Sequence, residues 1–109
     1  MIDLSDFEEY ELKRINPRSI EKAEEFLKRL KFDYPDLPDP EPTPEHDLLA
    51  LEWYRDAHHI LSISFDPDGT FHYAAIVGKM QIHGTGHLNT MLPSEFVRYI
   101  KWVFEEEKE

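Results

Sequence analysis

Apolar and polar side chains tend to alternate between residues 48 and 87, with the period of two expected for strands that bury one face. Turn signals divide this stretch at Asp56-Ala57-His58, at Asp66-Pro67-Asp68-Gly69 and at Gly78-Lys79. Proline presets the first position of a turn, and glycine accepts the positive φ that ends it. A two-residue loop that begins with glycine is typical of a hairpin. The pattern therefore predicts a four-stranded antiparallel meander.

The apolar pattern also selects the register of the strands. A slip of one residue turns every side chain to the other face, so a three-residue loop at 56–58 is needed to place Trp53 opposite Leu61. The next two loops put Phe65 opposite Phe71 and Val77 opposite Met80. One face of the sheet is then apolar throughout, with Leu49, Leu51, Trp53, Leu61, Ile63, Phe65, Phe71, Tyr73, Ala75, Val77, Met80 and Ile82.

Two helices are predicted on either side of the meander. Asn16-Pro17 is a favourable helix start, because asparagine caps a helix and proline suits its first turn. The apolar stripe of this first helix is Ile20, Ala23, Phe26, Leu27 and Leu30. The apolar stripe of the final helix is Phe96, Tyr99, Ile100, Val103 and Phe104. Packing both stripes on the apolar face of the sheet gives a two-layer α+β fold.

A chain of 109 residues is predicted to form one domain. Its expected parts are an N-terminal arm or short helix and the first helix (1–34), a proline-rich connector (35–47), the β-meander (48–88) and the C-terminal helix (92–108). Five prolines within 35–44 disfavour helix and sheet and favour an extended polyproline II spacer. Recognition of this spacer by a proline-binding groove is the alternative.

The second face of the predicted sheet is small and polar at its centre. The register places its residues in three rows: Glu52, Ser62, Ala74 and His83; Ala50, Ser64, His72 and Thr85; Tyr54, Ile60, Ile76 and Gln81. Antiparallel sheets often leave one face to water. This face is therefore either a solvated surface or a docking surface for a partner.

The chain is strongly acidic, with a formal net charge of −11. This charge argues against direct nucleic-acid binding, which requires lysine and arginine to neutralise phosphates. It favours a larger protein with a basic surface as the partner. The absence of cysteine, of a long apolar run and of a basic, then apolar N-terminus favours a cytoplasmic protein without disulfides, membrane anchor or signal peptide.

Histidines offer the main candidates for chemistry. His83 and His87 are four residues apart, which on a strand separates them by roughly 13 Å, too far for one ion. His72 lies diagonally across the sheet from His83, and the pair with a carboxylate such as Glu52 is a candidate shallow metal site. Serine hydrolysis requires an oxyanion hole that a flat sheet face does not offer. The sequence therefore predicts no catalytic residues and no cofactor, with a metal-dependent enzyme or metal-binding protein using His72 and His83 as the alternative.

Several short motifs of the C-terminal two-thirds resemble those of a loose group of small bacterial proteins. They are Leu51-Glu52-Trp53-Tyr54, Leu61-Ser62-Ile63-Ser64, Asp68-Gly69-Thr70, Tyr73-Ala74-Ala75, His83-Gly84-Thr85 and Leu92-Pro93. These motifs are turns, sheet core and a helix start, so the resemblance implies a fold and no activity. In size and charge, such proteins look like antitoxins, immunity proteins or phage-encoded inhibitors of defence systems.

Taken together, these patterns predict a non-enzymatic module that masks a basic surface on a larger protein, in one variant by mimicking nucleic-acid phosphate. The predicted partner-binding residues are Glu52, Tyr54, His72, His83, Thr85 and His87. An unpaired strand edge is a template for strand addition, so the Met80–His87 edge is predicted to bind the partner or a second copy of this chain. The alternative is that the N-terminal arm or the segment from Asn89 covers this edge.

Overall fold

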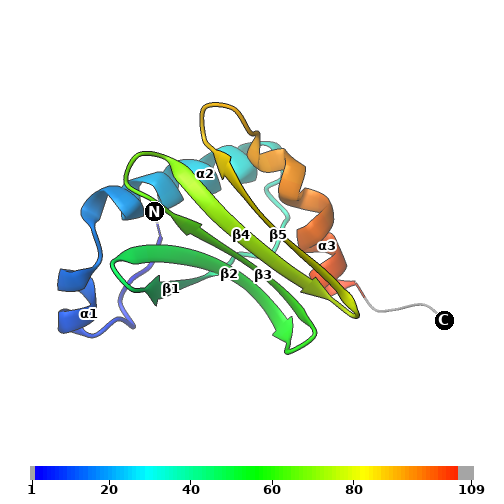
Figure 1. The fold of residues 1–109 in the computed structure, drawn as a ribbon, viewed down its shortest axis with the longest axis horizontal. Coiled ribbons are helices and arrows are strands. Elements are labelled where there is room, and N and C mark those ends of the chain that lie inside the picture. Colours follow the sequence, from blue (N-terminus) through cyan, green and yellow to red (C-terminus); the bar gives the residue numbers. More distant parts are fainter. Residues whose placement is uncertain (1, 106–109) are drawn as a thin grey trace.

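A computed structural model describes residues 2–105 as an antiparallel sheet with its helices on one face (Figure 1). The sheet has five strands in the order β1-β2-β3-β4-β5. They are β1 (Glu41–Glu45), β2 (Leu48–Asp56), β3 (His59–Phe65), β4 (Thr70–Val77) and β5 (Met80–His87). The predicted α+β class is confirmed, but the predicted number of four strands is wrong, because β1 was missed.

The predicted register of β2 to β5 is confirmed. Trp53 lies opposite Leu61, Phe65 opposite Phe71, and Val77 opposite Met80. The two glycines that the turns require both have positive φ, 95° at Gly69 and 63° at Gly78. Alternation and turn chemistry together were therefore sufficient to align these four strands.

The β2–β3 turn reaches the predicted register by another route. Asp56 pairs with His59, so the loop between the strands is shorter than the predicted three residues. The extra residue is accommodated as a β-bulge between Tyr54 and Asp56. A bulge inserts one residue into one strand, which keeps Trp53 on the apolar face.

Strand β1 corrects the prediction that the proline-rich segment 35–47 has no sheet structure. Its residues Glu41–Glu45 pair with β2, with Pro42 opposite Leu51 and Pro44 opposite Leu49. Proline is tolerated in an edge strand when its missing N–H would have faced away from the neighbouring strand.

The direction of the backbone groups shows that this condition is met. The N–H of Asp66 donates to the carbonyl of Thr70 at 2.8 Å, and residues along a strand alternate between neighbours. The register carries this alternation from β4 and β3 to β2 and β1. As a result, the backbone N–H and C=O groups of Thr43 and of the two glutamates of β1 face β2. The backbone groups of Pro42 and Pro44 face away from β2, so the missing N–H of each proline removes no bond of the sheet.

Three helices complete the fold within residues 2–105: α1 (Glu9–Arg14), α2 (Pro17–Asp33) and α3 (Val97–Phe104), the last preceded by the 3-10 turn η1 (Pro93–Phe96). The side chain of Asn16 accepts a hydrogen bond from the Arg18 N–H at 2.9 Å, as expected of a helix cap. The predicted final helix, 92–108, thus starts as a 3-10 turn, and 106–108 lie outside the described residues. No helix within residues 2–105 is long and apolar enough to cross a membrane.

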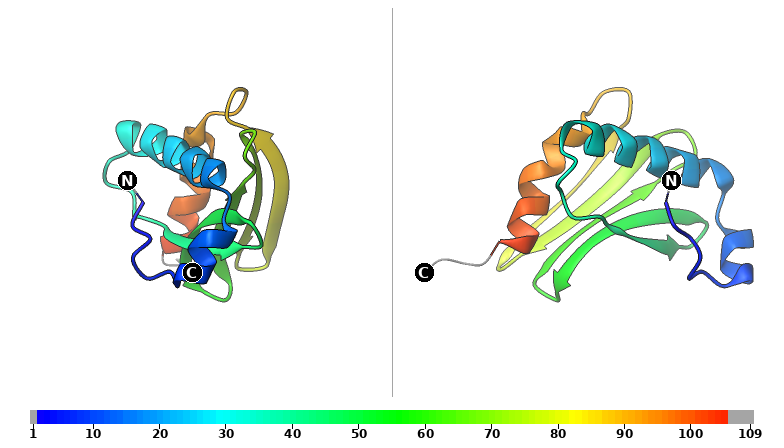
Figure 2. Two further views of the ribbon diagram at one scale, coloured as in Figure 1. Left: turned by 90° about the vertical axis from the view of Figure 1, so that its left-hand side faces the viewer. Right: turned by 180° about the vertical axis from the view of Figure 1, so that it is seen from behind.

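The core lies between the apolar sheet face and the helices α2 and α3 (Figure 2). Its centre is a cluster of aromatic rings from α2, β3, β4 and η1, with Phe26 5.3 Å from Phe65 and 5.7 Å from Phe96 between ring centroids. Ile2, Leu4 and Phe7 pack against the margin of this core. The N-terminal residues before α1 therefore pack on their own domain. Of the two predicted forms of this segment, an arm or a short helix, α1 is the short helix.

Candidate functional site

The face of the sheet that points away from α2 and α3 is called the open face here (Figure 2). Its strand positions are Glu41, Thr43, Glu45, Leu48, Ala50, Glu52, Tyr54, Ile60, Ser62, Ser64, Thr70, His72, Ala74, Ile76, Gln81, His83, Thr85 and His87. The three predicted rows are present, and β1 extends two of them with Glu41 and Thr43. None of these positions is lysine or arginine, although three are glutamate.

Two of the open-face glutamates lie directly opposite each other, Glu41 on β1 and Glu52 on β2. Within residues 2–105, no basic side chain forms an ion pair with either of them or with Glu45. Like charges in directly opposite cross-strand positions are destabilising. This acidic side of the open face is therefore uncompensated within the described chain.

An apolar row lies beside the acidic residues. It consists of Tyr54, Ile60 and Ile76, and it ends at Gln81. The Tyr54 side chain is 51% exposed, and both isoleucines are half-buried although the described helices α2 and α3 lie on the other face (Figure 2). A tyrosine with an exposed ring supplies contact area and a polar hydroxyl at the same position.

His72, a predicted site residue, is held by two neighbours. Its Nδ1 lies 3.2 Å from the Thr85 hydroxyl and its Nε2 lies 3.0 Å from Asp66 Oδ2. Asp66 precedes the β3–β4 turn and was not among the predicted residues. Sequence alone gave no signal for this contact, because it depends on the direction in which the His72 ring turns across the sheet.

The predicted pairing of His72 with His83 at a metal site is not seen. Both ring nitrogens of His72 are engaged with Thr85 and Asp66, while His83 is exposed on β5. Within the range 2–105, no three histidine, aspartate or glutamate side chains are grouped so that they could hold a metal ion.

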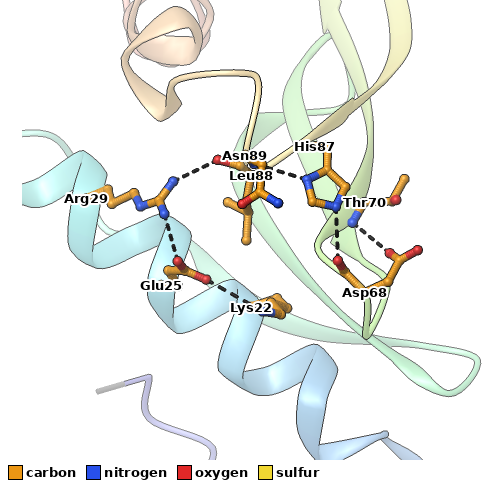
Figure 3. Close-up of polar contacts among 8 residues, drawn as sticks. All are labelled: Lys22, Glu25, Arg29, Asp68, Thr70, His87, Leu88 and Asn89. Atoms are coloured by element: carbon orange, nitrogen blue, oxygen red, sulfur yellow. Dashed lines mark hydrogen bonds and ion pairs between the residues drawn. The ribbon is translucent and has the colours of Figure 1, made fainter.

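His87 fastens the end of β5 to the β3–β4 turn (Figure 3). Its Nε2 donates to the backbone carbonyl of Asp68 at 3.0 Å, and its Nδ1 accepts from the N–H of Asn89 at 3.0 Å. These two bonds define the neutral Nε2–H tautomer. Both ring nitrogens thus serve the fold, although His87 was predicted as a partner-binding residue.

The surroundings of His87 tie three parts of the chain together (Figure 3). The backbone N–H of Thr70 donates to the Asp68 carboxylate at 2.8 Å, and this bond is the main cause that lowers the pKa of Asp68. On the other side, Arg29 of α2 donates to the Leu88 carbonyl at 2.8 Å and pairs with Glu25. The chain that leaves β5 is therefore anchored to both the turn and α2.

Two further polar residues with clear roles escaped the sequence analysis. His59, directly after the predicted turn at 56–58, is buried and bonds Asp56 at 2.8 Å, which is the main cause that lowers the pKa of Asp56. Ser19 of α2 is fully buried; its hydroxyl donates to the Phe65 carbonyl and accepts from the Leu49 N–H. Ser19 thereby bridges β2 and β3 where their direct bonding ends.

No protein-family model, no curated protein and no solved structure matches this chain. The geometry of the open face and of the sheet edges is therefore what indicates its function.

Proposed function

We propose that this protein is a non-enzymatic binding module whose open face masks a basic surface on a larger protein. The observation that carries the proposal is the charge of that face, which has three glutamates and neither lysine nor arginine at its strand positions. Complementary charge steers association and suppresses wrong partners. The module would act as an inhibitor of the antitoxin, immunity or anti-defence type.

The Glu41–Glu52 pair supports a cationic contact at this place. The two carboxylates oppose each other across β1 and β2 without a counter-ion among the described residues. An arginine or lysine from a partner would relieve the repulsion between the two carboxylates. The free energy of binding would therefore include this relief in addition to the new ion pair. The neighbouring row with Tyr54 supplies the apolar contact area that an affinity anchor requires.

The metal-dependent alternative gains no support, because His72 is engaged with Asp66 and Thr85. Of the predicted partner-binding residues, Glu52, Tyr54 and His83 are the ones we propose as direct contacts. Thr85 and His72 support the face between them.

The test is an affinity capture from the native host with three proteins in parallel, followed by mass spectrometry. They are the parent, a face variant (Glu41→Gln with Glu52→Gln) and a control variant (Glu21→Gln with Asp33→Asn). Both variants remove two negative charges, but the control residues are exposed on α2, on the other side of the sheet. We expect a basic protein that the parent and the control variant retain and the face variant loses.

The captured protein is then measured for its association rate at several salt concentrations. Because the Debye length falls to about 8 Å at physiological ionic strength, the rate should fall clearly as salt rises. A nucleic-acid-binding protein that DNA or RNA displaces from the module would identify phosphate mimicry as the form of masking. Retention by the face variant equal to that of the parent, or a rate independent of salt, would contradict the proposal.

A further inference from the structure

Strand β5 is the second edge of the sheet, and its outer side is unpaired within the described part of the chain. The N–H of Gly78 donates to the carbonyl of His58 at 2.8 Å, which fixes the direction of the backbone groups in β4 and hence in β5. By this alternation Gln81, His83, Thr85 and His87 point their N–H and C=O groups outward. The His87 carbonyl already accepts from Thr90 and Met91, whereas the other three residues keep both groups for pairing.

This edge lacks the features that usually protect an edge strand from pairing. It has eight residues, no proline, no charged side chain, and no bulge in its pairing with β4. The segment after it covers only its end, where the N–H groups of Thr90 and Met91 donate to the His87 carbonyl at 3.0 and 2.9 Å. No described residue makes such a bond to the outward groups of Gln81, His83 or Thr85. The described residues of the N-terminal arm pack at the margin of the core and make no backbone bond to β5.

We propose that β5 pairs with β5 of a second copy of this chain, in antiparallel orientation about a two-fold axis at His83. In this register Gln81, His83 and Thr85 each face an outward residue of the other copy, and His87, whose carbonyl is already occupied, lies outside the paired segment. His83 faces His83 of the other copy, and Gln81 faces Thr85. Each of these pairs exchanges two N–H···O=C bonds, and the two sheets become continuous.

The side chains on the helix side of β5 complement each other in the same register. Met80 faces Gly86 of the other copy, and Ile82 faces Gly84. Met80 is 41% exposed, and Ile82 is half-buried. Ile82 thus meets a position without a side chain, where it can cover the half-buried ring of Tyr73 that lies against Gly84. At Gly86 the space is already filled by the buried ring of Phe71 and by the Met91 sulfur of the same chain.

Charge also favours a second copy at this edge over the other one. Each chain has a net charge of −11, so two copies repel each other unless the contact avoids carboxylates. β5 has no charged residue, whereas β1 presents Glu41 and Glu45 within five residues. The uncharged edge is therefore the more favourable of the two for contact between acidic copies.

The salt dependence separates this inference from the proposed function. Screening weakens the repulsion between two acidic chains, so the dimer should become stronger as salt rises. Masking of a basic partner depends on attraction and weakens as salt rises. Either result can hold or fail without the other.

The experiment is sedimentation equilibrium of the full chain from micromolar to millimolar concentration, with two variants. His83→Lys places two ammonium groups at the two-fold axis, while the control Ala74→Lys adds the same charge at the exposed open-face position opposite His83, one strand further in. We expect a reversible dimer for the parent and for Ala74→Lys, and a monomer for His83→Lys. Circular dichroism verifies that both variants are folded.

Amide hydrogen exchange gives the second measurement, because it reports the backbone directly. The N–H groups of Gln81, His83 and Thr85 should exchange more slowly at high than at low protein concentration. A parent that is monomeric over the whole range would overturn the inference. So would a dimer in which these three amides exchange equally fast at both concentrations, or a His83→Lys variant that dimerises as the parent does.

Discussion

The two edges of this sheet are built in opposite ways. At β1, both outward positions are proline, so the edge has carbonyl acceptors there but no N–H donors. At β5, the outward positions are Gln81, His83, Thr85 and His87, each of which keeps its donor. The comparison shows that the capacity of an edge to add a strand is decided by which residues face outward. A high proline content protects β1 without preventing it from being a strand.

The two edges are also supported by different contacts. The chain before β1 is fastened by the indole of Trp53, whose Nε1 donates to the Pro38 carbonyl at 2.9 Å. β5 is held on the helix side by rings that lie over its glycines, since a Cβ at Gly84 would be 2.5 Å from the Tyr73 hydroxyl oxygen. Both glycines thus make room for side chains of the same molecule.

The largest effect on stability is expected from removing Trp53, which supports the chain before β1. Trp53 is fully buried, so Trp53→Ala should lower the free energy of unfolding by about 3–5 kcal/mol. The matched change on the β5 edge, His83→Ala, removes an exposed side chain and should cost less than about 1 kcal/mol. Urea unfolding followed by circular dichroism measures both. Equal losses in the two variants would show that the assignment of the faces is wrong.

A smaller effect is expected from filling the space above β5. A Cβ at Gly86 would lie 2.8 Å from the ring of Phe71 and from the Met91 sulfur, and Phe71 is fully buried. Gly86→Ala should therefore destabilise the protein by about 1–3 kcal/mol, as overpacking does. Gly84→Ala should cost less, because the Tyr73 ring that it meets is only half-buried and can move outward. Thermal unfolding of the two variants measures both losses. A larger loss for Gly84→Ala than for Gly86→Ala would contradict this prediction.

The smallest effect on stability is expected from removing the protection of β1. Pro42→Val with Pro44→Val restores two outward donors and should change the free energy of unfolding by less than about 1 kcal/mol. Self-association of this variant should nevertheless increase, which light scattering at matched concentrations measures. Thr43→Val is the control, because it adds the same side chain where the N–H already faces β2. Scattering that rises equally in the control would assign the effect to the added valine rather than to the edge.

Local chemistry in the sequence determined the class of the fold and the register of four strands. The turns at Gly69 and Gly78 and the alternation around Trp53 and Leu61 are properties of neighbouring residues, so they were predictable. The polar rows of the open face followed from the same register. All six predicted partner-binding residues lie on that face.

Tertiary structure alone decided how the edges and the polar groups are used. Whether Pro42 points toward or away from β2 depends on the direction of bonding in β2, which is set by its other neighbour, β3. The burial of His59 and the bridge made by Ser19 likewise join elements that are distant in the sequence. The alternation of apolar and polar side chains along a strand is a local property of its sequence. The side on which its backbone N–H groups point depends on the bonding of the neighbouring strands, and for that reason it could not be predicted from any one stretch of this sequence.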